Sequence, residues 1–251
     1  MTAPHAWIGK WEQQRREREV WEAANPEVAA AWNAAWEEDE RWRVVQYKKQ
    51  QAIESERRFP DRLQTVGVPL RCAELVRTAS ETPSQIAGKA FRSSECTFLL
   101  LLGGAGAGKS VAASWVLGDV LWPDVLGNPR VDAELLRRKA LFVRASEVSR
   151  VTASDYDEEA QGFLERCMRV PWLVIDDLGA ERAWDGWLAR LDELIDARYG
   201  DRRKTIITSN LDSKAFKERY GERIADRIRH DGTVVTAGAN SLRTKRPEAT
   251  P

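Results

Sequence analysis

Residues 103–110 of the chain are Gly103-Gly104-Ala105-Gly106-Ala107-Gly108-Lys109-Ser110, a full match to the pattern GxxxxGK[ST]. The run follows a short apolar stretch, Phe98–Leu102, and precedes a segment with helical periodicity, 109–120. Glycines permit positive φ angles and let backbone N–H groups approach an anion closely. A helix that begins near Lys109 points its positive N-terminal end at the same anion. The sequence therefore predicts a strand, a phosphate-binding loop and a helix in direct succession.

The ligand that such a loop predicts is a nucleoside triphosphate with Mg²⁺, and we expect ATP. In this arrangement Lys109 lies between the β- and γ-phosphates, and the Ser110 hydroxyl is a Mg²⁺ ligand. The predicted nucleotide-binding residues are Gly103, Gly104, Ala105, Gly106, Ala107, Gly108, Lys109, Ser110 and Val111.

Two carboxylates follow a later apolar run, Trp172–Ile175. We predict that Asp176 holds Mg²⁺ through water and that Asp177 orients the water that attacks the γ-phosphate. The alternative is a helix cap or a surface turn, because Asp-Asp before Leu-Gly is common in turns.

A third apolar run, Thr205–Thr208, also ends in polar residues. If this strand lies between the two strands described above, Asn210 can reach the γ-phosphate or the attacking water, and we predict a catalytic role for it. The alternative is that Asn210 is a turn or cap residue of the helix that follows it.

The remainder of the chain from about residue 61 to 243 alternates short apolar runs with amphipathic segments, which predicts an α/β fold with a central parallel sheet flanked by helices. The predicted strands are Thr97–Leu102, Ala140–Arg144, Trp172–Ile175, Thr205–Thr208 and Thr233–Thr236, and the predicted helices are 109–120, 155–168, 184–199 and 213–229. Residues 244–251 are polar and contain two prolines, so we expect a disordered tail.

Residues 1–60 have a different composition, rich in Trp, Glu, Arg, Ala and Gln. Asn25-Pro26 is a helix-start signal, so we predict a helix over 6–23, a break, and a long helix over 26–57 that ends near Phe59-Pro60. Tryptophans recur at helical spacing in both segments, at Trp7, Trp11, Trp21, Trp32 and Trp36. The helices either bury these rings against each other or the core, or present them as a docking surface.

Composition excludes several other classes. The 251-residue chain is 43% hydrophobic, carries no net charge, and has no apolar run near the roughly 18–20 residues that a membrane span needs. The N-terminus lacks the pattern of a secretory signal. An odd number of cysteines (Cys72, Cys96 and Cys167) without CxxC spacing indicates reduced thiols and, with only two histidines, no zinc site. We therefore expect a cytoplasmic protein.

With these motifs in hand, residues from about 63 to 243 resemble the AAA+ ATPase cores of bacterial and phage replicative helicase loaders of the DnaC/DnaI type. They are also similar to transposition helper ATPases of the IstB type. The segments that carry the resemblance are GGAGAGKS (103–110), LVIDDLGAE (173–181), TIITSNL (205–211), GERIADRIR (221–229) and GANSLR (238–243).

The resemblance implies that Arg227 is an arginine finger that reaches the ATP of a neighbouring subunit, with Arg223 as the second candidate; Arg243 assists more weakly. The alternative is that Arg223 and Arg227 form a solvated helix face. Many members of the family carry Glu where this chain has Asp177, one methylene shorter, so we expect slow hydrolysis that a partner stimulates. Glu181 is a more distant candidate for activating the water.

The function that the resemblance implies is loading of a replicative DNA helicase onto single-stranded DNA, with docking through residues 1–60 and ATP-dependent self-association. The segment 202–246 carries 12 Lys/Arg against 5 Asp/Glu, a local charge of +7, and together with Arg144, Arg150 and Arg182 it is a candidate DNA contact. The alternatives are an IstB-like helper that acts on DNA with a transposase, a small-molecule kinase, and an interaction protein that binds ATP without hydrolysing it.

Overall fold

The computed structural model of the chain describes residues 5–77, 82–153, 158–182, 184 and 186–238, with side chains described from residue 15 onward. The chain divides into two compact units, one up to Ile53 and one from Glu54. The predicted tail 244–251 and Arg243 lie outside the described residues. Among the residues that are described, no helix has both the length and the apolar character needed to cross a membrane.

The first unit consists of α1 (His5–Ala24) and the beginning of α2 (Pro26–Thr65), separated at Asn25 as predicted. Asn25 ends α1 through bonds from its own N–H and side-chain amide to Trp21 O. The rings of Trp32, Trp36 and Trp42 are about 60% exposed, so contact between α1 and α2 does not bury them.

The predicted end of the long helix at Phe59-Pro60 is wrong, because α2 continues through Pro60 to Thr65. Phe59 and Leu63 are buried in the core of the second unit, and their burial offsets the cost of a proline inside a helix.

The turn that follows α2 passes through Gly67, where φ is +95°, with Gly67 N–H bonded to Gln64 O and Val68 N–H to Leu63 O. A Cβ on Gly67 would also lie 2.1 Å from Phe142 O, so only glycine fits this turn.

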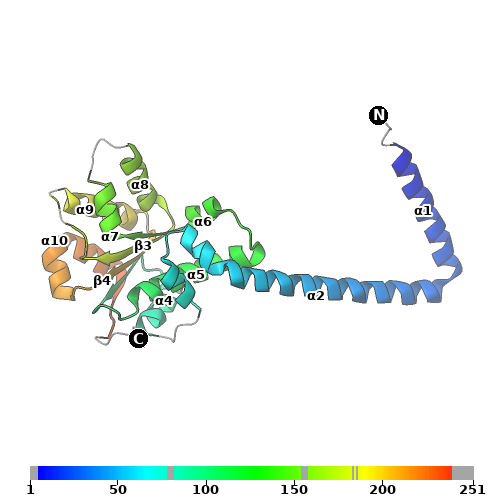
Figure 1. Cartoon of the computed structure of the whole chain (residues 1–251), viewed down its shortest axis with the longest axis horizontal. Helices are drawn as coiled ribbons and strands as arrows, with labels where there is room; N and C mark the ends of the chain where they lie inside the picture. Colours follow the sequence, from blue (N-terminus) through cyan, green and yellow to red (C-terminus); the bar gives the residue numbers. More distant parts are fainter. Residues whose placement is uncertain (1–4, 78–81, 154–157, 183, 185, 239–251) are drawn as a thin grey trace, which may run out of the picture. The chain divides into compact units, whose positions relative to one another are not determined.

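The second unit is built on a five-stranded parallel sheet with the strand order β2-β3-β4-β1-β5. The strands are β1 (Phe98–Leu102), β2 (Ala140–Arg144), β3 (Trp172–Leu178), β4 (Lys204–Ser209) and β5 (Gly232–Thr236). Figure 1 shows this sheet between two groups of helices. All five predicted strands are present, and β4 lies between β1 and β3 as the position of Asn210 required.

Each face of the sheet packs on its own helices. Phe98, Leu100 and Leu102 of β1 belong to a core cluster with α7 (Ala145–Val151), α8 (Glu158–Arg169), α9 (Trp187–Gly200) and α10 (Ser213–His230). Leu99 and Leu101 face the end of α2, α3 (Leu70–Leu75), α4 (Pro83–Ser93), α5 (Lys109–Gly127) and α6 (Ala133–Lys139). A strand covered on both faces needs a continuous apolar run, and FLLLL supplies it.

Four helices, α3, α4, α6 and α7, were not predicted, and α5 runs seven residues beyond its predicted end at 120. The predicted helices 155–168, 184–199 and 213–229 correspond to α8, α9 and α10; residues 155–157 lie outside the described part. Strand β3 extends past Ile175 to include both aspartates, with an irregularity in its pairing to β4 between Ile175 and Leu178.

Candidate nucleotide-binding site

The glycine-rich loop 103–108 joins the carboxyl end of β1 to the first residue of α5, Lys109. Gly103, Gly106 and Gly108 have positive φ angles of +139°, +85° and +80°, and Gly108 is the residue that caps α5. A Cβ on Gly103 would lie 2.7 Å from Ala237 O. The loop therefore needs glycine for conformation and for space, and it places backbone N–H groups at the positive end of α5.

Lys109 is almost fully buried, and its ammonium group donates to three oxygens at the mouth of this loop. The acceptors are Gly103 O at 2.7 Å, Gly104 O at 2.8 Å and Asn210 Oδ1 at 3.0 Å. The Lys109 ammonium group thus lies between the glycine-rich loop and the end of β4.

Asp176 lies next to Ser110 and Thr208. Its Oδ1 accepts hydrogen bonds from Ser110 Oγ and Thr208 Oγ1, each at 2.7 Å. Burial raises the pKa of Asp176, and these two hydrogen bonds oppose that shift. The structure thus joins the predicted metal-binding hydroxyl and carboxylate, and hard oxygen donors of this kind suit Mg²⁺. No group of three or more His, Cys, Asp or Glu in the described part of the chain forms a separate metal site.

Replacement of Asp176 by Asn should stabilise the protein in the absence of nucleotide. Because the pKa of Asp176 is raised in the folded state, ionisation above the ordinary value of 3.8 removes stability as pH rises. Asparagine keeps the acceptor for Ser110 and Thr208 without the charge. At pH 7 and without nucleotide, we expect Asp176→Asn to melt about 2–4 °C higher, a gap that narrows towards pH 4.

The control is Asp201→Asn, because Asp201 is exposed and its carboxylate pairs with Arg203 at the surface. Differential scanning calorimetry from pH 4 to pH 8 measures the difference. A lower melting temperature for Asp176→Asn at pH 7 would contradict the expectation.

Asp177 has a left-handed backbone, with φ of 60°, which is unusual for a residue other than glycine. Its N–H donates to Thr208 Oγ1 at 2.9 Å, and its Oδ1 accepts from Asn210 Nδ2 at 2.6 Å. The side chains of Lys109, Asn210 and Asp177 therefore form a hydrogen-bonded chain across the ends of three adjacent strands. The sequence predicted that these three residues lie close together, and they are in contact in the structure; their catalytic roles stay predictions.

Arg227 lies elsewhere, on α10. Its guanidinium pairs with Asp192 at 2.7 Å and with Asp196, both on α9, and its side chain is 17% exposed. Arg223 pairs with Asp192 at 3.2 Å and is 66% exposed. These contacts hold both arginines against α9, and the arginine-finger role stays a prediction.

Glu181, the distant candidate for activating the water, is turned away from the loop into a buried network with Arg219, Tyr220 and Trp187. The sequence does not predict this network. Its only signal is an acidic residue four positions after Asp177.

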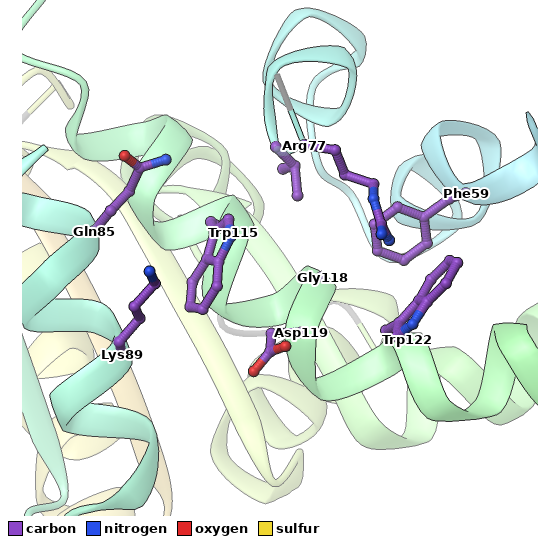
Figure 2. A pocket seen from close by; sticks show the side chains of 9 residues that line it. Phe59, Arg77, Gln85, Lys89, Trp115, Gly118, Asp119 and Trp122 are labelled. Atoms are coloured by element: carbon purple, nitrogen blue, oxygen red, sulfur yellow. The ribbon is translucent and has the colours of Figure 1, made fainter. Parts of the chain in front are cut away.

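Two pockets flank α5 and the loop. One, of about 500 Å³, is lined by Gly103, Gly104, Asn210, Leu211, Asp212, Ser213, Lys214 and Thr236 and opens beside the phosphate-binding loop. The other, of about 330 Å³, lies where α5 meets α2, α3 and α4. Figure 2 shows this second pocket, with Lys89 beside Trp115 and Arg77 beside Trp122. The guanidinium carbon of Arg77 lies 4.2 Å from the centroid of the Trp122 ring. The second pocket shares no lining residue with the loop pocket.

Residues 136–249 match the family described as IstB-like ATP binding protein, a range that holds β3, β4 and α10 and begins after the glycine-rich loop. The matched range covers less than half of the chain, so residues 136–249 are similar to IstB-like ATP-binding proteins. The glycine-rich loop that precedes this range is consistent with ATP binding.

Other known proteins are similar to the chain in sequence or in fold. The chain is 27% identical over 139 residues to the uncharacterised protein YdaV of Escherichia coli (strain K12), over 55% of this chain and 51% of that protein. The match thus spans about half the length of this curated relative. Two solved structures share its fold. One is the DnaC helicase loader (TM-score 0.50, 21% identity, 65% of this chain and 96% of that one). The other is a protein described as a primosome component of Streptococcus pyogenes serotype M3 (TM-score 0.53, 20% identity, 74% and 98%).

Proposed function

We propose that this ATPase is a loader of a replicative DNA helicase in the cytoplasm, and that it helps to place the helicase on single-stranded DNA. The observation that carries the proposal is the fold shared with the DnaC helicase loader over 96% of that chain, beside a separate helical unit with exposed tryptophans. A loader needs an ATP-controlled core and a surface that grips its partner, and the two units supply one each.

The proposed chemistry follows from the contacts around the loop. Mg²⁺, when bound with ATP, neutralises charge that develops on the phosphates. Ser110 and Asp176 are the protein oxygens that would hold it, and Thr208 orients the carboxylate. Lys109 donates to the phosphates. Asn210 holds Oδ1 of Asp177, so we assign Oδ2 to the attacking water. The shorter side chain at 177 is the reason that we propose slow turnover.

For the arginine finger we propose Arg227 acting in trans, which requires an ATP-dependent oligomer. Arg227→Ala should lose most ATP turnover when assayed alone, about a hundredfold or more if it acts as arginine fingers do. Mixing it with Lys109→Ala should restore part of the activity, because the Lys109→Ala subunit still has a finger to offer to an intact site.

An equimolar mixture assayed for phosphate release against each variant alone measures this rescue. Arg223→Ala is the matched control, because Arg223 lies on the same helix and also pairs with Asp192. If Arg223→Ala requires rescue and Arg227→Ala does not, the finger is Arg223.

For contact with single-stranded DNA we favour Arg144, Arg150 and Arg182 over the basic segment 202–246. Many cations of that segment are committed to ion pairs with carboxylates, among them Arg219, Arg223, Arg227 and Arg229. The three favoured arginines are exposed, and Ser149 beside Arg150 donates to Arg182 O at 2.9 Å, which brings two of them onto one surface.

The helicase proposal is tested with the full chain, by native mass spectrometry with the replicative helicase of the source organism, with and without ATP. We expect a defined complex that Trp32→Ala/Trp36→Ala abolishes, because both rings are exposed and aromatic anchors dominate interfaces. The control is Asn33→Ala/Glu37→Ala on the same helix. No complex in any nucleotide state would overturn the loader proposal.

The alternative is an IstB-like transposition helper, which the family match at residues 136–249 favours. It predicts ATP-dependent binding to duplex DNA in preference to single strands, and association with a transposase in place of a helicase.

A further inference from the structure

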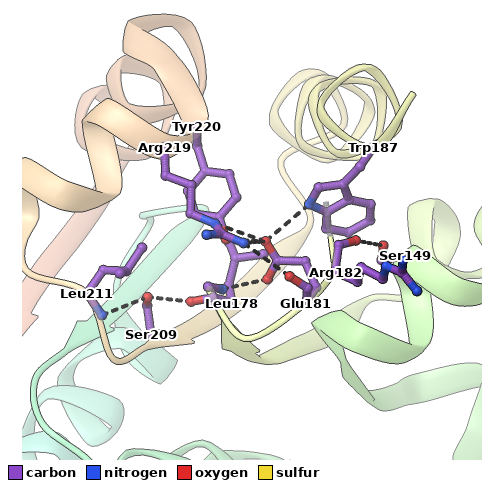
Figure 3. Close-up of polar contacts among 10 residues, drawn as sticks. Ser149, Leu178, Glu181, Arg182, Trp187, Ser209, Leu211, Arg219 and Tyr220 are labelled. Carbon is purple, nitrogen blue, oxygen red and sulfur yellow. Dashed lines mark hydrogen bonds and ion pairs between the residues drawn. The ribbon is translucent and has the colours of Figure 1, made fainter. Parts of the chain in front are cut away.

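Glu181 is a buried carboxylate close to the catalytic aspartates, and its side chain has no exposed surface. Figure 3 shows it at the centre of a polar network. Its oxygens accept hydrogen bonds from Gly179 N (2.6 Å), Tyr220 Oη (2.7 Å), Arg219 Nη2 (3.1 Å), Arg219 Nε (3.3 Å) and Trp187 Nε1 (3.3 Å). A buried carboxylate needs hydrogen-bond partners, and Glu181 has them from three separate parts of the chain.

Burial opposes ionisation of Glu181, but the hydrogen bonds from Tyr220 and Gly179 and the contact with Arg219 outweigh it and keep its pKa below the ordinary value. Glu181 is therefore an anion at neutral pH, and each of its contacts is charge-assisted.

One contact fixes the turn that carries Asp177. Asp177 and Gly179 both have left-handed φ angles, 60° and 116°, and Ala180 N–H closes the turn onto Asp177 O at 3.1 Å. Glu181 Oε2 holds Gly179 N–H from one side. From the other side, Ser209 Oγ donates to Leu178 O and accepts from Leu211 N–H. Glu181 is therefore one of the groups that hold the turn in which Asp177 lies.

The other contacts tie the same carboxylate to α10. Arg219 and Tyr220 are the last residues before a break in that helix at Gly221, where φ is 83° and ψ is 164°. Arg223 and Arg227 follow the break. A single anion thus joins the Asp177 turn to the helix that carries both arginine-finger candidates.

We propose that Glu181 is a positioning residue for ATP hydrolysis, which sets the Asp177 carboxylate relative to Asn210 and fastens the Asp177 turn to α10. The proposal rests on the proposed role of Asp177 and needs neither a helicase nor DNA. A failure of the loader proposal therefore leaves it standing.

The test is steady-state ATP hydrolysis by Glu181→Gln, together with the affinity for a fluorescent ADP analogue. Glutamine keeps an acceptor for Gly179 but turns an amide donor towards the donors Arg219 and Tyr220. We expect kcat to fall about tenfold while KM and nucleotide affinity change less than about twofold, because the loop at 103–110 is untouched. Glu218→Gln is the matched control, since Glu218 lies beside Arg219 on α10 but is exposed.

A double variant separates positioning from general support of the fold. If Glu181 acts through Asp177, Glu181→Gln should cost little further activity in an Asp177→Asn background, since coupled residues are not additive. Two results would overturn the proposal: a double variant in which the two fold-losses in kcat multiply, or a normal kcat for Glu181→Gln alone. If Glu181→Gln fails to fold, Arg219→Ala removes one partly exposed donor and leaves Glu181 in place. It should lower kcat about threefold and show the same non-additivity with Asp177→Asn, and additive losses there would again overturn the proposal.

Discussion

Replacing Lys109 with alanine is expected to reduce ATP turnover about a hundredfold to a thousandfold, the usual effect of removing one preorganised donor to developing charge. The Lys109 ammonium already lies at the mouth of the loop, within 3.0 Å of Gly103 O, Gly104 O and Asn210 Oδ1. Phosphate oxygens are stronger acceptors for a cation than amide oxygens, so the same group can transfer to the nucleotide with little movement.

Phosphate release at saturating ATP measures this effect, with Lys139→Ala as the control. Lys139 is also a cation within the second unit, but it is half exposed and pairs with Asp124 on the surface. We expect normal turnover for the control. Retention of more than about a tenth of wild-type turnover by Lys109→Ala would contradict the assignment of this lysine to the transferred phosphate.

Replacing Arg198 with methionine is expected to destabilise the protein by about 3–5 kcal/mol, because several buried carbonyl groups would lose their donor together. The Arg198 guanidinium has no exposed surface, and burial lowers its pKa while leaving it protonated at neutral pH. Its partners are Thr205 Oγ1, Cys167 O, Met168 O, Val170 O and Lys204 O, at 2.7–3.2 Å. Cys167 and Met168 lie in the last turn of α8 and Val170 directly follows it, where a cation also suits the helix dipole.

Chemical denaturation followed by circular dichroism measures this loss, with Arg169→Met as the control. Arg169 is 72% exposed and pairs with Glu165 one turn away, so its replacement should change stability by less than about 1 kcal/mol. Equal stability of the two variants would show that the carbonyl groups find other donors, such as water.

The parts of the fold that sequence predicted are those governed by local pattern. A five-residue apolar run directly before GxxxxGK[ST] predicts a buried strand that leads into a phosphate-binding loop and a helix, and the structure has β1 and α5 at these positions. The polar ends of β3 and β4 then had to meet beside that loop, because parallel strands end at one edge. Asp176, Asp177 and Asn210 could be placed together for this reason.

The parts that sequence missed depend on tertiary contact. The start of α4 is an exception, because Thr82 and Gln85 form a capping box with a proline at the first helical position, which is a local signal. Pro60 was a misleading signal, since burial of Phe59 and Leu63 lets α2 continue through it to Thr65. Arg198 and Glu181 are buried charges, and a hydropathy pattern assigns charges to the surface.

The left-handed backbone at Asp177 has a consequence for how this protein can change. Glycine adopts that conformation freely, whereas an aspartate there costs on the order of 1–2 kcal/mol. Variants selected only for resistance to heat are therefore expected to carry glycine at position 177. Such variants would lack the carboxylate that we propose orients the attacking water. Selection for heat resistance and selection for turnover would then pull in opposite directions at this one residue.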